Sequence, residues 1–276
     1  HDCVHASAET YSERTCGRRS ERVRKEKGMK KGKLLGVLMA MAVGLQVSSP
    51  VTFAETNSET DPFIRGVDVS TLDMLEKLGA HYYENGKEGD ALGILHNNGA
   101  NYVRLKIWVD PYDKDGNPYG GGNNDFETTL SLAKRAKEQG MGILIDFHLS
   151  DFWADPANQI KPKAWEGLSF SELETTVYQY MKDTLNDFAK EGIVPEMVQV
   201  GNEISSGILH DEGKVENSEE QFQNLGRLLK KAIAGVRDSE AKGTKIILHL
   251  DQGGKNDLYT WWFGNLLKQF PDLDFD

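Results

Sequence analysis

The feature that most constrains the fold is a repeated alternation of short apolar runs and amphipathic segments. Five runs have the length of strands, and each is followed by a segment with helical spacing of its apolar side chains. Ile143, Leu144 and Ile145 are too continuously apolar for a sheet with one wet face. Strict alternation of this kind predicts a parallel sheet covered by helices. The expected strands are 63–70, 102–109, 141–147, 197–203 and 245–250, and the expected helices are 90–98, 126–139, 171–188, 222–236 and 258–270, with a sixth strand starting at 273.

Two architectures are compatible with this pattern, an open doubly wound sheet and a closed barrel. A dinucleotide-binding sheet should have a glycine-rich turn after its first strand, and Gly66 and Gly79 do not form one. Polar or aromatic side chains instead follow several strands, as in a (β/α)8 TIM barrel. We therefore expect an α/β fold in which residues 55–276 form the N-terminal part of such a barrel, truncated after about five and a half βα units.

The first 54 residues differ in composition from the rest. Residues 1–28 are polar and arginine-rich, and we interpret them as a non-native or disordered leader. Residues 29–54 combine a lysine-rich start, the apolar run 34–45 and small residues, which is typical of a secretory signal peptide. The apolar run is shorter than the roughly 20 residues that span a bilayer. We expect a secreted, extracellular protein.

Charge and cysteine content exclude other classes of protein. The chain carries a net charge of −11, and because the leader is basic the remaining part is more acidic still. An acidic surface disfavours nucleic acid and anionic membranes. Both cysteines, Cys3 and Cys16, lie in the leader, so we expect a core without disulfides. We expect a monomer that binds neither nucleic acid nor membrane.

The run 197–203 ends in an amide and a carboxylate, Asn202 and Glu203. At the carboxyl end of a barrel strand, such a pair is expected to lie in the active site. We interpret Glu203 as the proton donor of a glycoside hydrolase, with Asn202 bonding a sugar hydroxyl. The alternative is a carboxylate placed at a helix N-terminus by the helix dipole. A glycosidase also needs a second carboxyl group.

Two further strands carry candidate site residues. Arg104 lies between apolar neighbours in the second strand, and a buried guanidinium needs an anionic partner. It forms either a salt bridge with Asp68 or Asp146 or a contact that orients a catalytic carboxylate. His148 ends the third strand and is either a ligand for a sugar hydroxyl or a satisfied core histidine.

The loop 150–165 has the composition of a saccharide cleft. Trp153 offers a ring that stacks on sugar C–H faces, and Asp151, Asp155 and Asn158 offer groups that bond hydroxyls. Loop packing is the alternative for the same residues. The segment 113–117 has calcium-loop spacing only at its start, so we predict a turn there and no metal site or cofactor in this part of the chain.

Four segments together resemble glycoside hydrolase family 53, the secreted endo-β-1,4-galactanases. They are Gly66–Ser70, Asn101–Pro111, Asp146–Pro156 and Gly201–Glu203. The resemblance implies a (β/α)8 barrel that hydrolyses β-1,4-galactan, including that of pectic arabinogalactan, with retention.

The same resemblance implies roles for single residues. Glu203 matches the general acid/base, Asn202 the amide beside it, and Arg104 the arginine that supports the nucleophile. The family's nucleophile is a glutamate at the end of the seventh strand, beyond residue 276, where a calcium site would also lie. We therefore expect these residues alone to be inactive. Another endo-glycanase of the same clan, such as a mannanase or cellulase, and a non-catalytic carbohydrate-binding barrel are the alternatives.

Overall fold

The computed structural model describes residues 63–276. The leader 1–28 and the signal peptide 29–54 lie outside the described residues, so both interpretations stay predictions. Within 63–276, no helix is long and apolar enough to span a membrane.

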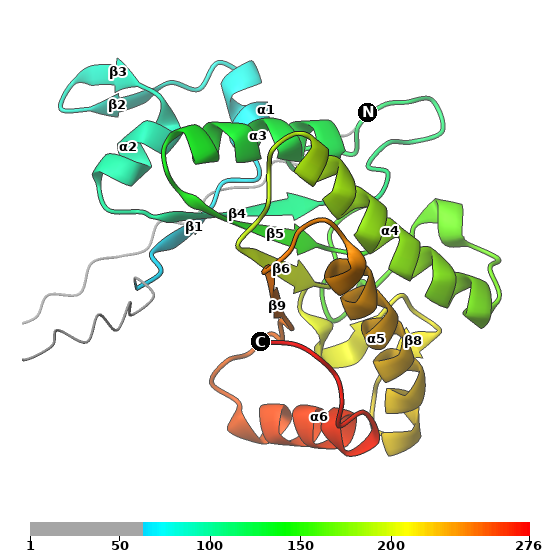
Figure 1. The fold of residues 1–276 in the computed structure, drawn as a ribbon. Helices are drawn as coiled ribbons and strands as arrows, with labels where there is room; N and C mark the ends of the chain where they lie inside the picture. The colour runs from blue at the N-terminus through cyan, green and yellow to red at the C-terminus, as the bar shows by residue number, and fades with distance from the viewer. Residues whose placement is uncertain (1–62) are drawn as a thin grey trace, which may run out of the picture. The chain divides into compact units, whose positions relative to one another are not determined.

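The centre of the fold is a five-stranded parallel sheet (Figure 1). Its strands pair in chain order without a reversal, whereas a doubly wound sheet reverses its order at a switch point. This topology confirms the barrel-type prediction. The strands are β1 (Gly66–Asp68), β4 (Tyr102–Ile107), β5 (Gly142–Phe147), β6 (Met197–Val200) and β9 (Lys245–Ile247).

Amphipathic helices connect the strands, and consecutive helices pack side by side. Phe126 of α3 contacts Phe188 of α4, and Phe222 of α5 contacts Trp262 of α6. Helix α4 also packs along α5. The helices are α1 (Leu72–Lys77), α2 (Ala91–Asn97), α3 (Phe126–Glu138), α4 (Phe170–Lys190), α5 (Phe222–Asp238) and α6 (Asn256–Gln269), with 3₁₀ turns at Lys163–Trp165, Ile204–Ser206 and Glu219–Gln221.

Side-chain caps explain where two of these helices begin. Asp125 accepts a hydrogen bond from the Thr128 N–H, as predicted for the start of α3. Ser169 and Glu172 form a reciprocal capping box at α4, which begins one residue earlier than the sequence pattern indicated.

The structure adds two antiparallel hairpins that the sequence analysis missed. One joins β2 (Tyr82–Glu84) to β3 (Lys87–Gly89), and the other joins β7 (Gly207–Ile208) to β8 (Gly213–Lys214). The sixth strand expected from residue 273 is not formed as a strand, although the Asp276 N–H donates to the Ile246 carbonyl of β9.

Candidate active site

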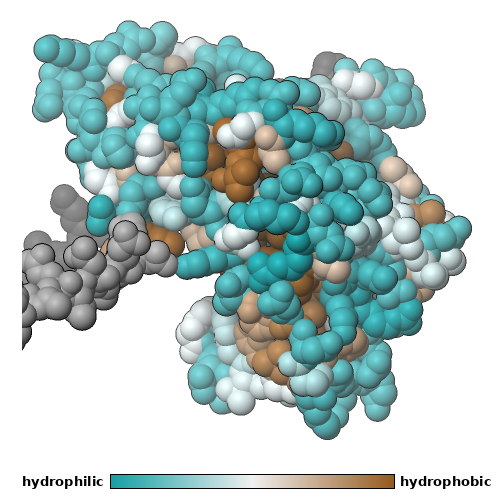
Figure 2. Space-filling model, viewed as in Figure 1, coloured by the Kyte–Doolittle hydropathy of each residue, from teal (hydrophilic) through white to brown (hydrophobic). Residues whose placement is uncertain are grey.

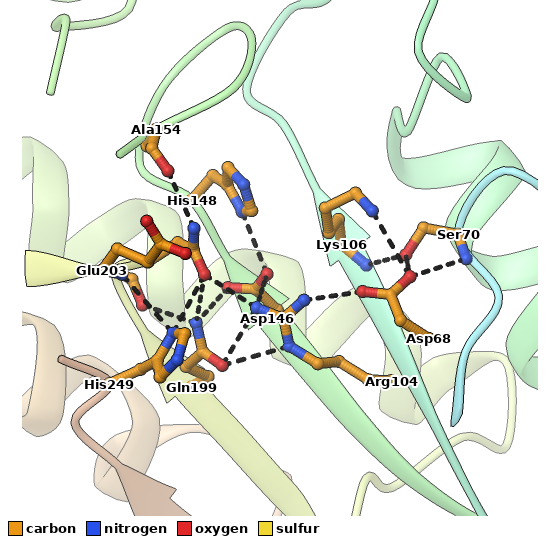
Figure 3. Close-up of polar contacts among 12 residues, drawn as sticks. Asp68, Ser70, Arg104, Lys106, Asp146, His148, Ala154, Gln199, Glu203 and His249 are labelled. Atoms are coloured by element: carbon orange, nitrogen blue, oxygen red, sulfur yellow. Dashed lines mark hydrogen bonds and ion pairs between the residues drawn. The ribbon is translucent and has the colours of Figure 1, made fainter. Parts of the chain in front are cut away.

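The carboxyl ends of the five strands bring a set of polar side chains into one cluster (Figure 3). Strand register places Asp68 beside Arg104 and Asp146 beside Gln199. These residues come from four neighbouring strands, so the sheet itself sets their spacing.

Arg104 is the centre of this cluster. Its Nη1 lies 2.6 Å from Asp68 Oδ2, and its Nη2 lies 2.6 Å from Asp146 Oδ2. Nη2 also donates to Asn202 Oδ1 at 2.8 Å, and Nε to Gln199 Oε1 at 3.2 Å. Both anticipated ion pairs therefore form at once, while contact with a catalytic nucleophile stays a prediction.

Asp68 is held ionised by its surroundings. Burial raises the pKa of its carboxyl, but hydrogen bonds from Ser70, the charge of Lys106 and the Arg104 contact outweigh that effect and lower it. Ser70 donates from both its hydroxyl, at 2.7 Å, and its backbone N–H, at 3.0 Å. The first strand end thus carries a fixed negative charge.

His148 lies behind the cluster and is completely buried. Its Nδ1 is 3.0 Å from Asp146 Oδ2, and its ring packs edge-on against Trp108 and Trp153. This geometry satisfies the core interpretation, yet Nε2 makes no hydrogen bond to any of residues 63–276. Because that nitrogen is also shielded from solvent, contact between His148 and a sugar stays a prediction.

Glu203 stands at the rim of the sheet with a left-handed backbone, at φ 51°. It follows Gly201, also at positive φ, where an added Cβ would overlap Ile204. The two left-handed residues turn the chain out of β6 directly before and at Glu203, which lies at the edge of the cluster (Figure 3).

Glu203 is the N-cap residue of the short 3₁₀ turn Ile204–Ser206, as the helix-terminus alternative requires, but its side chain makes no cap hydrogen bond. Its carboxylate makes no hydrogen bond or ion pair within residues 63–276. A half-buried carboxylate without a protein partner, next to a fixed amide, is available to a ligand.

Two residues of this site were given no role from the sequence, although His249 was noted as a polar residue at a strand end. Gln199 bridges Arg104 and Asp146, and His249, after β9, lies 3.0 Å from Asn202 Oδ1 through its Nδ1. Burial, followed by the positive charge of Arg104, lowers the pKa of the His249 imidazole. His249 is therefore neutral around pH 7.

The predicted saccharide loop divides into structural and exposed residues. Asp151 accepts hydrogen bonds from the backbone N–H groups of Asp110 and Lys163, so it braces the loop. Asp155 and Asn158 bond each other, at 2.8 and 3.0 Å, in a local turn. Their hydrogen-bonding capacity is largely used within the loop, which favours the packing alternative for these three residues.

Trp153 is different, because its side chain is 43% exposed. The ammonium of Lys106, a buried lysine that the sequence analysis did not select, lies 4.5 Å from the centre of its ring. Lys106 Nζ also lies 3.3 Å from Asp68 Oδ1. The exposed ring is therefore connected to the charged cluster, and its outer face remains open.

The calcium-like segment forms a turn. Asp113 Oδ1 accepts from the backbone N–H groups of Asp115 and Asn117. Among the described residues, no group of three or more His, Cys, Asp or Glu side chains is arranged to hold a metal ion.

A sequence profile of glycosyl hydrolase family 53 matches residues 64–276, which include the whole sheet and every residue of the cluster. The chain belongs to this family. An endo-β-1,4-galactanase of Bacillus subtilis is 40% identical over 213 residues, and the match covers 77% of this chain and 48% of that protein. An arabinogalactan endo-β-1,4-galactanase of Humicola insolens is 40% identical over 216 residues, covering 77% and 61%.

Solved structures of the family confirm the fold. The family 53 catalytic domain of Ignisphaera aggregans superposes with a TM-score of 0.71 at 45% identity, covering 78% of this chain and 57% of that one. A fungal β-1,4-galactanase gives 0.70 at 39% identity, covering 78% and 62%. The chain thus spans about half to three fifths of the length of these relatives. The described strands correspond to part of the TIM barrel of this family.

Proposed function

We propose that this chain carries the general acid/base of a secreted, monomeric galactanase. That enzyme hydrolyses the β-1,4-galactosidic bonds of galactan and arabinogalactan with retention. The observation that carries the proposal is the unpartnered Glu203 carboxylate, held at the strand rim beside an amide that the protein has already oriented. Relatives at about 40% identity are named β-1,4-galactanases, which supports this substrate.

In the proposed reaction, Glu203 protonates the glycosidic oxygen as the bond to the anomeric carbon breaks. A second carboxylate attacks that carbon, and Glu203 then takes a proton from the water that releases the sugar. Asn202 bonds a hydroxyl of the reacting sugar, and Trp153 stacks against a neighbouring one.

The second carboxylate should lie about 5 to 5.5 Å from Glu203 in a retaining enzyme. Asp68 and Asp146 are both held in ion pairs with Arg104, so neither carboxylate suits the role. We propose that the nucleophile, and any calcium site, lies on strands that the relatives carry beyond the matched part. Residues 63–276 would then bind galactan without hydrolysing it.

The test uses this chain joined to the C-terminal strands of a family relative. Glu203→Gln should lower kcat on galactan by a factor of about 10² to 10⁴, because it removes general acid catalysis, and should leave galactan binding unchanged. Glu212→Gln, a carboxylate that pairs with Lys161 outside the cluster, is the matched control. Near-normal turnover by Glu203→Gln would refute the role.

Reducing-end release from galactan, mannan and cellulose separates the alternatives. Preferential release from mannan or cellulose would favour another endo-glycanase of the clan. Binding to a polysaccharide without hydrolysis by the completed barrel would favour a carbohydrate-binding protein.

A further inference from the structure

The side-chain amide of Asn202 is held in a single orientation. Its Oδ1 faces three donors, Arg104 Nη2 at 2.8 Å, His249 Nδ1 at 3.0 Å and Gln199 Nε2 at 3.1 Å. Its Nδ2 donates to the Ala154 carbonyl at 2.8 Å. A flipped amide would place N–H against the guanidinium and oxygen against a carbonyl, so only one orientation is satisfied.

Gln199 has its own orientation fixed by the buried charges on either side. Its Oε1 accepts from the Arg104 guanidinium. The two hydrogens of its Nε2 are shared among Asp146 Oδ1 at 2.7 Å, the Gly201 carbonyl at 2.8 Å and Asn202 Oδ1 at 3.1 Å. Reversing this amide would place its oxygen against the Asp146 carboxylate. The charges of Arg104 and Asp146 therefore fix the orientation of the Gln199 amide, and this orientation points Gln199 Nε2 at Asn202 Oδ1.

His249 completes the set from the neighbouring strand end. The backbone N–H of Glu203 also points to its Nδ1, at 3.4 Å, but one nitrogen cannot donate and accept at the same time. The shorter contact to Asn202 Oδ1, at 3.0 Å, indicates that Nδ1 carries the hydrogen. The neutral ring is then the Nδ1–H tautomer, with a lone pair on Nε2.

We propose that Gln199 and His249 are positioning residues of the acid/base site. Together with Arg104 they hold the Asn202 amide so that its second Nδ2–H stays available beside Glu203 for a substrate hydroxyl. The inference rests on the proposed function, because it assigns these residues to the same reaction. Neither has to touch the substrate.

The first test is Gln199→Glu in the completed barrel. The charged and titratable groups around the new carboxyl are Asp146, Arg104, His249 and Glu203 (Figure 3). Ionised, the carboxyl repels Asp146 and cannot donate to Asn202. Protonated, its O–H can replace the lost donor.

We therefore expect kcat at neutral pH to fall about tenfold to a hundredfold, since a small misplacement of a catalytic group has that effect. The activity relative to wild type should rise as the pH falls. Gln223→Glu, an exposed change on α5 with the same charge difference, should leave the pH profile unchanged. A loss by Gln199→Glu that is the same at every pH overturns the role of Gln199.

The second test compares two substitutions of His249. Asparagine places its Nδ2 where the imidazole has Nδ1 and so keeps the donor, whereas leucine removes it. His249→Leu should lower kcat about tenfold and His249→Asn should restore most of the loss. Equal activities of the two variants overturn the role of His249.

A third measurement needs no hydrolysis. In the chain as it stands, ¹⁵N NMR of the imidazole should show the neutral Nδ1–H tautomer of His249, and an Nε2–H tautomer would overturn the proposed contact. Failure of the proposed function has a different signature, because the completed wild-type barrel would then release no sugar from galactan while the tautomer remained as expected.

Discussion

Replacing Arg104 by methionine should destabilise the protein severely, because it leaves Asp146 charged and buried. The Asp146 side chain is fully buried, and Arg104 Nη2 at 2.6 Å is its closest cation. At an effective dielectric constant of about 20 this contact is worth roughly 6 kcal/mol before desolvation. Loss of one partner of a buried ion pair typically costs about 3 to 5 kcal/mol, and we expect Arg104→Met to fall in that range.

Asp68 contributes little to this loss, because it keeps its hydrogen bonds to Ser70 and the contact with Lys106. The measurement is the free energy of unfolding in urea, followed by tryptophan fluorescence. Arg135→Met is the control, since Arg135 also bridges two carboxylates, but both of these, Glu76 and Asp90, are partly exposed to solvent, so that its loss leaves no fully buried charge.

A double variant, Arg104→Met with Asp146→Asn, removes the charge as well as its partner. It should recover part of the lost stability. A loss below about 1 kcal/mol in Arg104→Met, or a double variant no more stable than the single one, would refute this account.

Two further predictions concern stability. Gly235→Ala on α5 would place a Cβ against the Tyr178 carbonyl of α4, so it should lower the free energy of unfolding by about 1 to 3 kcal/mol. Gly264→Ala on α6, with no atom within 4 Å of the new carbon, should raise the free energy of unfolding by up to about 1 kcal/mol. If Gly264→Ala proved less stable than Gly235→Ala, the packing described for these two helices would be contradicted. Because the folded pKa of Asp68 is depressed, its contribution to stability should be present above the unfolded value of about 3.9 and be lost as the pH falls through the folded value. The stability difference between wild type and Asp68→Asn should shrink accordingly in urea titrations between pH 6 and pH 3, and a constant difference would exclude this linkage.

The strands and helices were predictable because both faces of a parallel sheet are buried, which leaves an apolar signature in the sequence. The hairpin β2–β3 was missed although its signal is present. Asn85 and Gly86 join its strands, and both have positive φ, as a two-residue hairpin turn requires. The strands are only three residues long and largely exposed, so the hydrophobic pattern that revealed the sheet does not mark them.

The candidate site was predictable where a residue type is rare in its context. Arg104 in an apolar strand and Glu203 at a strand end are conspicuous, and the structure brings them into one cluster. Gln199, between Val198 and Val200, is equally anomalous, because a buried amide must find partners. Its partners lie on other strands, so its role depends on register, which the sequence pattern did not specify.

The strand register also explains how the polar contacts of Arg104 and Asn202 can all be made within these five strands. Every ion pair of Arg104 is made by a neighbour on β1 or β5, and every donor to Asn202 Oδ1 comes from β4, β6 or the segment after β9. A hydrophobic area remains between β9 and α6 (Figure 2). Strands added at the β9 edge, as the proposed function requires, would extend the sheet there. The orientation of Asn202 is accordingly a property of these residues themselves, which is why the His249 tautomer can be measured in this chain without any hydrolysis.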